Sequence, residues 1–301
     1  MSASVLKFLE KARTYFAFIE LRKMGTFFFA LPAIMWQVLF LYVPIAAIIT
    51  MSVINKVAPG AWYSLTWQHY HEILNPLFLN IMWRSLLLAL CTSMLCMTFA
   101  YPVAYFLALR ATTWKNTLLL LLFLPFWTNF LIQVYAWFFI LERNGFLNRV
   151  LLKVGLITEP LQIMNTPSAI YIVMFFCYLP FMIMPIYTSL EKINRRLFEA
   201  SYDLGATPWQ TFKRVIFPLS MSGVKTGFFL VFIPTFGEYV IPAMLGGGKT
   251  FYVGSLLSYF FIDSPNMHLG SSFTVVSGFV LIVAVVFITI MFKWLMRLAR
   301  G

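Results

Sequence analysis

The sequence is poor in charge, in cysteine and in histidine. The shortage of charge and the shortage of cysteine each exclude a class of protein. Only 11% of the 301 residues are charged, whereas about 25% is usual in soluble globular domains. The three cysteines, Cys91, Cys96 and Cys177, lie inside apolar runs and give no disulfide framework. A soluble protein and a disulfide-stapled protein are therefore both excluded.

Apolar residues are what the chain has in excess. They make up 61% of the sequence, and the mean hydropathy is +0.84. A helix that crosses a membrane needs ~20 predominantly apolar residues. Six such segments can be drawn: Phe27–Met51, Ile81–Leu109, Thr117–Leu141, Ala169–Leu190, Gly223–Gly246 and Ser271–Met296. Unbroken runs exclude a transmembrane β-barrel, which needs alternation. The sequence predicts an all-α integral membrane protein with six transmembrane helices.

The basic residues orient these segments. The net charge is +12, and 16 of the 22 Lys and Arg fall on one side of the membrane if the N-terminus is cytoplasmic. Because positive charge is retained inside, both termini are expected in the cytoplasm. We expect residues 1–26 to form an interfacial cytoplasmic helix, with a solvated tail as the alternative. Residues 27–296 form the membrane domain, and 297–301 a cytoplasmic tail.

The longest cytoplasmic connection, residues 191–222, carries the strongest local signals. Leu197, Ala200 and Leu204 recur at helical spacing, and Gly205 can end that helix in the left-handed conformation. Thr207 and Pro208 are suited to cap and begin the next helix. The pattern predicts a helix, a glycine turn and a helix, which is a compact surface for docking another protein.

This loop resembles the cytoplasmic loop of permeases from binding-protein-dependent ABC importers. Their pattern is EAA, three residues, Gly, nine residues and Ile-x-Leu-Pro. The spacing is kept here, with Ser, Val and Phe in place of Ala, Ile and Leu, at Glu199, Ala200, Ser201, Gly205, Val215, Phe217 and Pro218. The resemblance implies a type I (MetI-like) permease architecture in which this loop couples to an ATPase. The phrases beginning at Pro125, Thr166 and Gly237 are similar to spermidine/putrescine importer permeases in particular.

The same resemblance implies partners. They are a second homologous permease, two cytoplasmic ATPases that bind ATP and Mg, and a periplasmic protein that delivers substrate. This chain would hold no cofactor, no metal and no nucleic acid, would contact membrane lipid, and would be a transport component of a bacterial inner membrane rather than an enzyme. Two alternatives remain: a permease for another small solute, and a self-sufficient secondary transporter, which has no reason to carry the coupling loop.

Polar groups at membrane depth mark a candidate substrate path. Glu238 lies about fifteen residues into the fifth segment, and an ionised carboxylate at that depth costs ~2.5–3.5 kcal/mol unless it faces water or a partner. Thr235, Glu238, Tyr239 and Pro242 are expected on one helical face, with helix breakers nearby. A path for a cation is one interpretation. The alternative is an ion pair with a basic residue of a neighbouring subunit.

The third segment offers a second candidate wall of aromatic and amide groups. Asn129, Gln133 and Trp137 share one helical face, and Trp127 and Tyr135 lie nearby. Ammonium groups favour aromatic faces, so this wall suits a polyamine. Helix packing explains the same residues as well.

Two other motifs are weak. His69, His71 and Glu72 could contribute to a metal site, but we favour a solvated or interfacial loop. The segment AMLGGGKT, residues 243–250, matches a relaxed phosphate loop but lacks the preceding strand, and we expect a flexible glycine-rich connection.

Overall fold

The computed structural model describes residues 30–56, 63–111, 113–248 and 250–298. The helix expected within residues 1–26 and the end of the tail lie outside these ranges. Within them, five helices are long and apolar enough to cross a membrane, and a bent helix pair supplies a sixth candidate. The predicted helical membrane protein is confirmed, while two of the six spans differ in shape from the prediction.

The chain divides into two units, residues 1–67 and 68–301. In the first, a helical span runs over Ala30–Val53 and contains a π-helical turn, η1 (Val38–Tyr42), followed by α2 (Val43–Val53). Strands β1 (Ile54–Lys56) and β2 (Tyr63–Leu65) then pair antiparallel, with Asn55 opposite Ser64.

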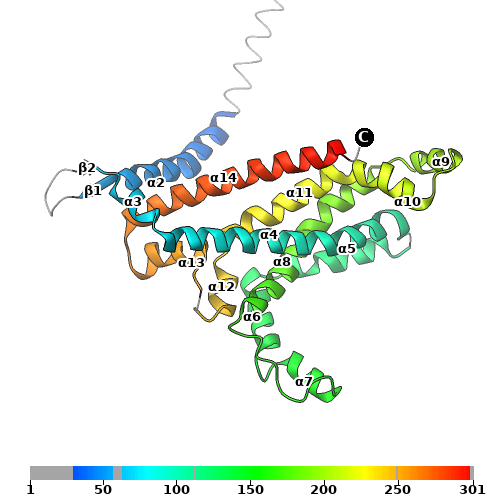
Figure 1. Cartoon of the computed structure of the whole chain (residues 1–301), viewed down its shortest axis with the longest axis horizontal. Helices are drawn as coiled ribbons and strands as arrows, with labels where there is room; N and C mark the ends of the chain where they lie inside the picture. The colour runs from blue at the N-terminus through cyan, green and yellow to red at the C-terminus, as the bar shows by residue number, and fades with distance from the viewer. Residues whose placement is uncertain (1–29, 57–62, 112, 249, 299–301) are drawn as a thin grey trace, which may run out of the picture. The chain divides into compact units, whose positions relative to one another are not determined.

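The second unit holds the remaining helices, labelled in Figure 1. In chain order they are α3 (Gln68–Ile73), α4 (Pro76–Tyr105), η2 (Phe106–Arg110), α5 (Lys115–Phe123), η3 (Leu124–Trp127), α6 (Phe130–Leu141), α7 (Phe146–Lys153), α8 (Pro167–Glu191), α9 (Arg196–Asp203), α10 (Pro208–Thr211), η4 (Phe212–Ile216), α11 (Phe217–Phe236), α12 (Val240–Leu245), α13 (Val253–Ser258), η5 (Tyr259–Asp263) and α14 (Met267–Leu298).

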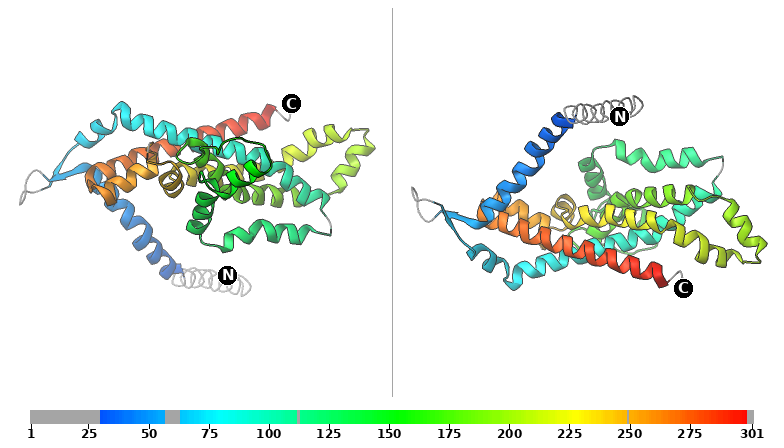
Figure 2. Two further views of the ribbon diagram at one scale, coloured as in Figure 1. Left: turned by 90° about the horizontal axis from the view of Figure 1, so that it is seen from below. Right: turned by 90° about the horizontal axis from the view of Figure 1, so that it is seen from above.

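The core of this unit is the mutual packing of α4, α8 and α11, which Figures 1 and 2 show side by side. Large side chains buried there include Leu88 on α4, Met182 and Ile186 on α8, and Phe228 and Phe232 on α11. Most of the apolar surface of α14 stays exposed, because little of this helix packs against the other helices of the unit. Burial therefore concentrates on three helices, which form a rigid frame for the site.

Two glycines let α8 and α11 approach closely. A Cβ atom on Gly223 would lie 2.4 Å from the Pro185 carbonyl oxygen, and one on Gly227 would lie 2.9 Å from Sδ of Met182. Glycines four residues apart on one face are a known device for close helix contact in membranes. The α8–α11 pair therefore depends on the absence of side chains at these positions.

The third span is not the straight helix that we predicted. Residues Lys115–Trp127 and Phe130–Lys153 meet at an angle of 95°. Pro125 lies in η3, and Asn129 caps the start of α6 with its side chain. The proline removes a backbone donor and the asparagine starts a new helix, so the chain turns where hydropathy alone indicated continuity.

The fifth span also differs from the prediction. Its helix begins at Pro208, runs for 29 residues to Phe236 and stops there. A break over residues 237–239 separates it from the short helix α12. Thr235, Glu238, Tyr239 and Pro242 therefore do not lie on one face of a continuous helix, because Pro234 and Gly237 end the helix rather than merely weaken it.

Candidate functional site

The predicted glycine turn between two helices is present at residues 196–211, which we call the α9–α10 hairpin. Gly205 has φ +80° and follows α9 directly after Leu204. A Cβ at this position would meet nothing within 4 Å. The turn therefore requires glycine for its backbone conformation and not for space.

Local hydrogen bonds close the hairpin. Thr207 and Gln210 form a reciprocal capping box, with Gln210 N to Thr207 Oγ1 at 3.3 Å and Thr207 N to Gln210 Oε1 at 2.8 Å. The Ser201 and Thr211 hydroxyls lie 2.5 Å apart across the turn. Ser201, which departs from the family pattern, thus gains a hydrogen-bond partner on the facing helix.

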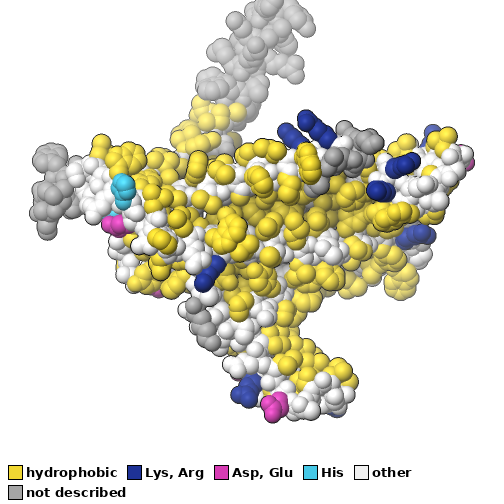
Figure 3. All heavy atoms as spheres, viewed as in Figure 1, with side chains coloured by type: hydrophobic (Ala, Val, Ile, Leu, Met, Phe, Trp, Pro, Cys, Tyr) yellow, Lys and Arg dark blue, Asp and Glu magenta, His cyan; other side chains and the backbone are white. Residues whose placement is uncertain are grey.

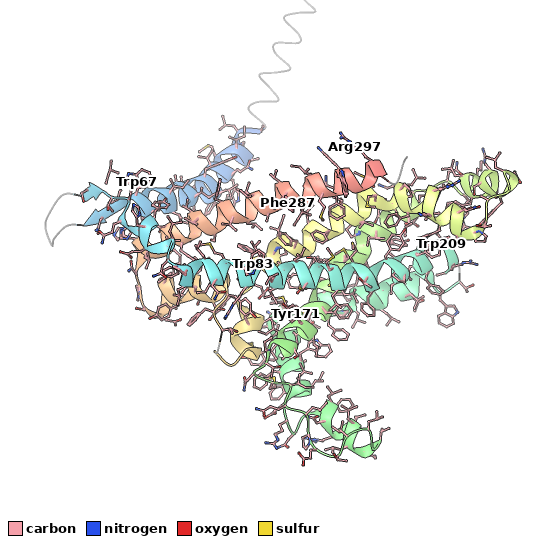
Figure 4. The ribbon with its side chains drawn as sticks, in the orientation of Figure 1. Trp67, Trp83, Tyr171, Trp209, Phe287 and Arg297 are labelled. Atoms are coloured by element: carbon pink, nitrogen blue, oxygen red, sulfur yellow. The ribbon has the colours of Figure 1, made fainter. Side chains whose placement is uncertain are left out.

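The outer surface of the hairpin combines charge with exposed apolar side chains. Glu199 and Ala200 are exposed. Leu204 is 89% exposed and Trp209 is 69% exposed, and Tyr202 is also largely uncovered. Figure 4 shows Trp209 on this hairpin. Sequence analysis missed Tyr202 and Trp209, although an aromatic residue beside a cap in a polar loop was an available signal. Exposed apolar groups in such a loop are typical of a docking surface.

The end of the loop motif is anchored in the helical frame. Phe217 and Phe212 both contact the Tyr101 ring on α4, at centroid distances of 5.8 Å and 5.9 Å. The Tyr101 hydroxyl lies 2.9 Å from the Ser220 hydroxyl. Val215 and Pro218 are half-buried, and the π-helical turn η4 directly precedes Phe217 and Pro218. The motif therefore ends inside the continuous helix of the fifth span.

Two clefts flank this end of the second unit. One of about 240 Å³ lies between α9 and the end of α4, and its lining includes Tyr105, Arg110, Arg195 and Tyr202. Another of about 440 Å³ lies between α8 and α11, lined by hydroxyl groups and by Lys192. Within the described part of the chain, a salt bridge joins Lys115 Nζ to Glu191 Oε1 at 2.6 Å and links the start of α5 to the end of α8.

Glu238 lies in the break between α11 and α12, where both carboxylate oxygens accept hydrogen bonds. The Tyr178 hydroxyl on α8 donates to Oε2 at 2.5 Å, and the Val240 backbone N–H donates to Oε1 at 3.0 Å. Glu238 is half-buried, whereas Tyr178 is 8% exposed. Each of the two carboxylate oxygens of Glu238 thus has one hydrogen-bond donor at the break.

The backbone of the break is packed against α13. A Cβ on Gly254 would lie 2.4 Å from the Gly237 carbonyl oxygen and 2.7 Å from that of Glu238. The Val253 N–H at the start of α13 donates to Ser85 Oγ on α4 at 2.8 Å. The break is therefore also held in place by contacts that do not involve the Glu238 side chain.

Its neighbours in the predicted path differ in exposure. Tyr239 is 43% exposed beside the break. Thr235 is 1% exposed, and its hydroxyl donates to the carbonyl oxygens of Val231 and Phe232 in its own helix. The Tyr239 side chain is therefore exposed at the break, whereas the Thr235 hydroxyl is hydrogen-bonded within its own helix.

The amides predicted to line the third span are used at its break. Asn129 Oδ1 accepts the Leu131 N–H at 2.8 Å, and Gln133 Nε2 donates to the Pro125 carbonyl oxygen and to Thr128 Oγ1. Trp137 stacks on Phe176 at a centroid distance of 4.4 Å. Trp127 and Tyr135 are exposed. Of the predicted wall, Asn129 and Gln133 thus stabilise the kink and Trp137 packs on α8. The rings of Trp127 and Tyr135 are left exposed.

The weaker motifs carry no site among the residues that the structure describes. No group of three or more metal-ligating side chains converges there. His69 is buried on α3 and stacks on His268, so this residue lies in a helix rather than in the expected solvated or interfacial loop. Gly247 and Gly248 form a turn after α12 with positive φ, and a helix rather than a strand precedes them.

Comparisons with known proteins agree with this geometry. Residues 100–300 match the family described as "Binding-protein-dependent transport system inner membrane component". The spermidine/putrescine transport system permease protein PotB of Escherichia coli (strain K12) is 38% identical over 253 residues, which cover 82% of this chain and 92% of PotB.

Two crystal structures of a bacterial alginate ABC transporter contain chains with the same fold. One has a TM-score of 0.72 at 16% identity and covers 90% of this chain and 96% of its own. The other, solved with an alginate pentasaccharide-bound periplasmic protein, has a TM-score of 0.70 at 15% identity and covers 88% and 93%. The fifth span with its break and the α9–α10 hairpin are thus parts of a permease of an ABC importer, which is not an enzyme. The chain belongs to the family of inner membrane components of binding-protein-dependent transport systems.

Proposed function

We propose that this chain is one permease subunit of an importer that passes spermidine or putrescine into the cytoplasm. The observation that carries the proposal is the extensive identity with PotB, whose name records those substrates. The half-buried Glu238 carboxylate supplies suitable chemistry, because a single negative charge at a helix break attracts an ammonium group without holding it tightly.

The energy comes from separate ATPase subunits that bind ATP and Mg. In this proposal the α9–α10 hairpin fits a groove on an ATPase, with Glu199 and Ala200 at the contact and the exposed Leu204 and Trp209 beside them. A second homologous permease completes the path, and a periplasmic protein delivers the substrate. One of the alginate transporter structures includes such a periplasmic protein.

Both termini face the cytoplasm in this arrangement. Figure 3 shows Lys and Arg side chains near α9 and α10 and near the C-terminal end of α14, while hydrophobic side chains cover much of the rest of this face. Positive charge at one end of a helical membrane unit indicates the cytoplasmic side.

Uptake by the purified complex tests the proposal. We expect ATP-dependent accumulation of labelled spermidine or putrescine in vesicles when the periplasmic protein is present. Competition only by a neutral or anionic solute would instead support a permease for another substrate. Uptake that persists with an inactive ATPase would support a secondary transporter.

Charge substitution tests the role of Glu238. Glu238→Gln keeps the size of the side chain and removes its charge, so polyamine uptake per assembled complex should fall by about tenfold or more, equivalent to ~1.4 kcal/mol. Glu238→Lys should be worse, because it places a like charge against the substrate. The matched control is Glu159→Gln, which removes a carboxylate from an exposed loop. Loss of assembly in both Glu238 variants, with normal uptake per complex, would indicate an ion pair between subunits.

A further inference from the structure

We propose that Tyr178 is a positioning residue for the transported cation, and that it acts through the Glu238 carboxylate. This inference rests on the proposed function and adds a residue that no sequence motif indicates. The contact joins side chains 60 positions apart, with the Tyr178 hydroxyl 2.5 Å from Glu238 Oε2.

The first step of the argument is the hydrogen-bonding capacity of the carboxylate. An ionised carboxylate offers about four acceptor sites, and the two donors observed here fill two of them. The other two remain for a primary ammonium group, which has three donors. The contacts of Glu238 therefore fix its orientation and leave it able to bind a cation.

The second step separates positioning from folding. The break keeps its backbone through the packing of Gly254 and the bond from Val253 to Ser85. The Val240 N–H holds the other carboxylate oxygen. Removal of the Tyr178 hydroxyl alone therefore leaves the break in place and frees one side of the carboxylate.

The third step concerns the Tyr178 ring, which belongs to the rigid frame. Its side chain is 8% exposed on α8, and the ring lies 6.1 Å from the Phe181 ring. Tyr178→Phe keeps this packing and deletes only the donor. Transport should then fall because Glu238 samples orientations that do not meet the passing ammonium group.

A double-mutant cycle on uptake per assembled complex tests this. Tyr178→Phe should lower polyamine uptake about three- to tenfold, the range expected for the loss of one ordinary hydrogen bond. In the Glu238→Gln background the same change should have no further effect, because the group that it positions is already uncharged. Tyr171→Phe is the matched control, since Tyr171 lies two turns earlier on α8 (Figure 4) beside Cys91 and Tyr252.

The outcomes separate the two proposals. Absence of spermidine and putrescine uptake by the wild-type complex would overturn the proposed substrate and this inference with it. Wild-type uptake combined with independent, multiplicative losses in the double variant would overturn only the role of Tyr178. Equal losses in Tyr178→Phe and Tyr171→Phe, or a loss that follows the amount of assembled complex, would also overturn it.

Discussion

At the scale of single residues, Gly205 is the position where backbone conformation bears on the proposed coupling to an ATPase. Its φ of +80° is open to glycine and, at small cost, to asparagine, but not to β-branched residues. Because a Cβ there meets nothing within 4 Å, side-chain volume is not the constraint. Two substitutions can therefore be compared that both fit the available space but differ in how readily they adopt positive φ.

We expect Gly205→Val to abolish ATP-driven uptake and Gly205→Asn to retain most of it. Valine in the left-handed region costs ~1–3 kcal/mol, enough to reorganise an exposed turn. The measurement is uptake together with co-purification of the ATPase for both variants. Equal behaviour of the two variants would contradict a conformational role for this turn.

The residue scale also shows what sequence can and cannot reveal. Gly205, Thr207 and Pro208 were identified correctly because turns and caps depend on residues a few positions apart. The pairing of Tyr178 with Glu238 had no such signal, since it depends on how α8 packs beside the break. The capping role of Asn129 at the start of α6 had a local signal in the neighbouring Pro125, but the apolar run around it indicated a single continuous span.

At the scale of helices, the α8–α11 contact depends on two glycines. A Cβ on Gly223 would lie 2.4 Å from Pro185 O and 2.5 Å from Ser189 Cβ, so neither helix can stay where it is if a side chain is added. Gly278 on α14 differs, because a Cβ there would meet nothing within 4 Å.

We expect Gly223→Ala to lower the thermal stability of the detergent-solubilised chain, by an amount typical of overpacking, ~1–3 kcal/mol. Gly278→Ala should leave stability unchanged or raise it slightly, since alanine favours helix. Thermal unfolding followed by circular dichroism compares the two variants. A Gly278→Ala variant that is the less stable of the pair would refute the packing argument.

Hydropathy located the spans because apolar length is a property of each segment alone. It did not locate their breaks, because a break also depends on contacts with other segments. The third and fifth segments are predominantly apolar, yet η3 and residues 237–239 interrupt them. Pro125, Pro234 and Gly237 indicated weak points. Whether a weak point becomes a kink or a complete stop is decided by neighbours such as Gly254, which the local sequence does not contain.

At the scale of the whole molecule, the orientation in the membrane remains a prediction that labelling can check. We expect a cysteine at Thr250 to react with an impermeant thiol reagent in intact cells, and one at Leu204 to react only in inverted vesicles made without the partner ATPases. A Cys91→Ser background is needed, because Cys91 is exposed while Cys96 and Cys177 are buried. Reaction of both positions from the same face would refute the proposed topology.

The helix from Pro208 to Phe236 has a mechanical consequence. Its 29 residues span about 43 Å at ~1.5 Å per residue, from the turn at Gly205 to the residue before the break. A tilt of about 5° about the contact at Gly223 and Gly227, roughly 16 Å before Phe236, would displace the end at the break by about 1.5 Å. A continuous helix of this length can transmit a tilt from the turn at Gly205 to the break, with the glycine contact with α8 as the pivot.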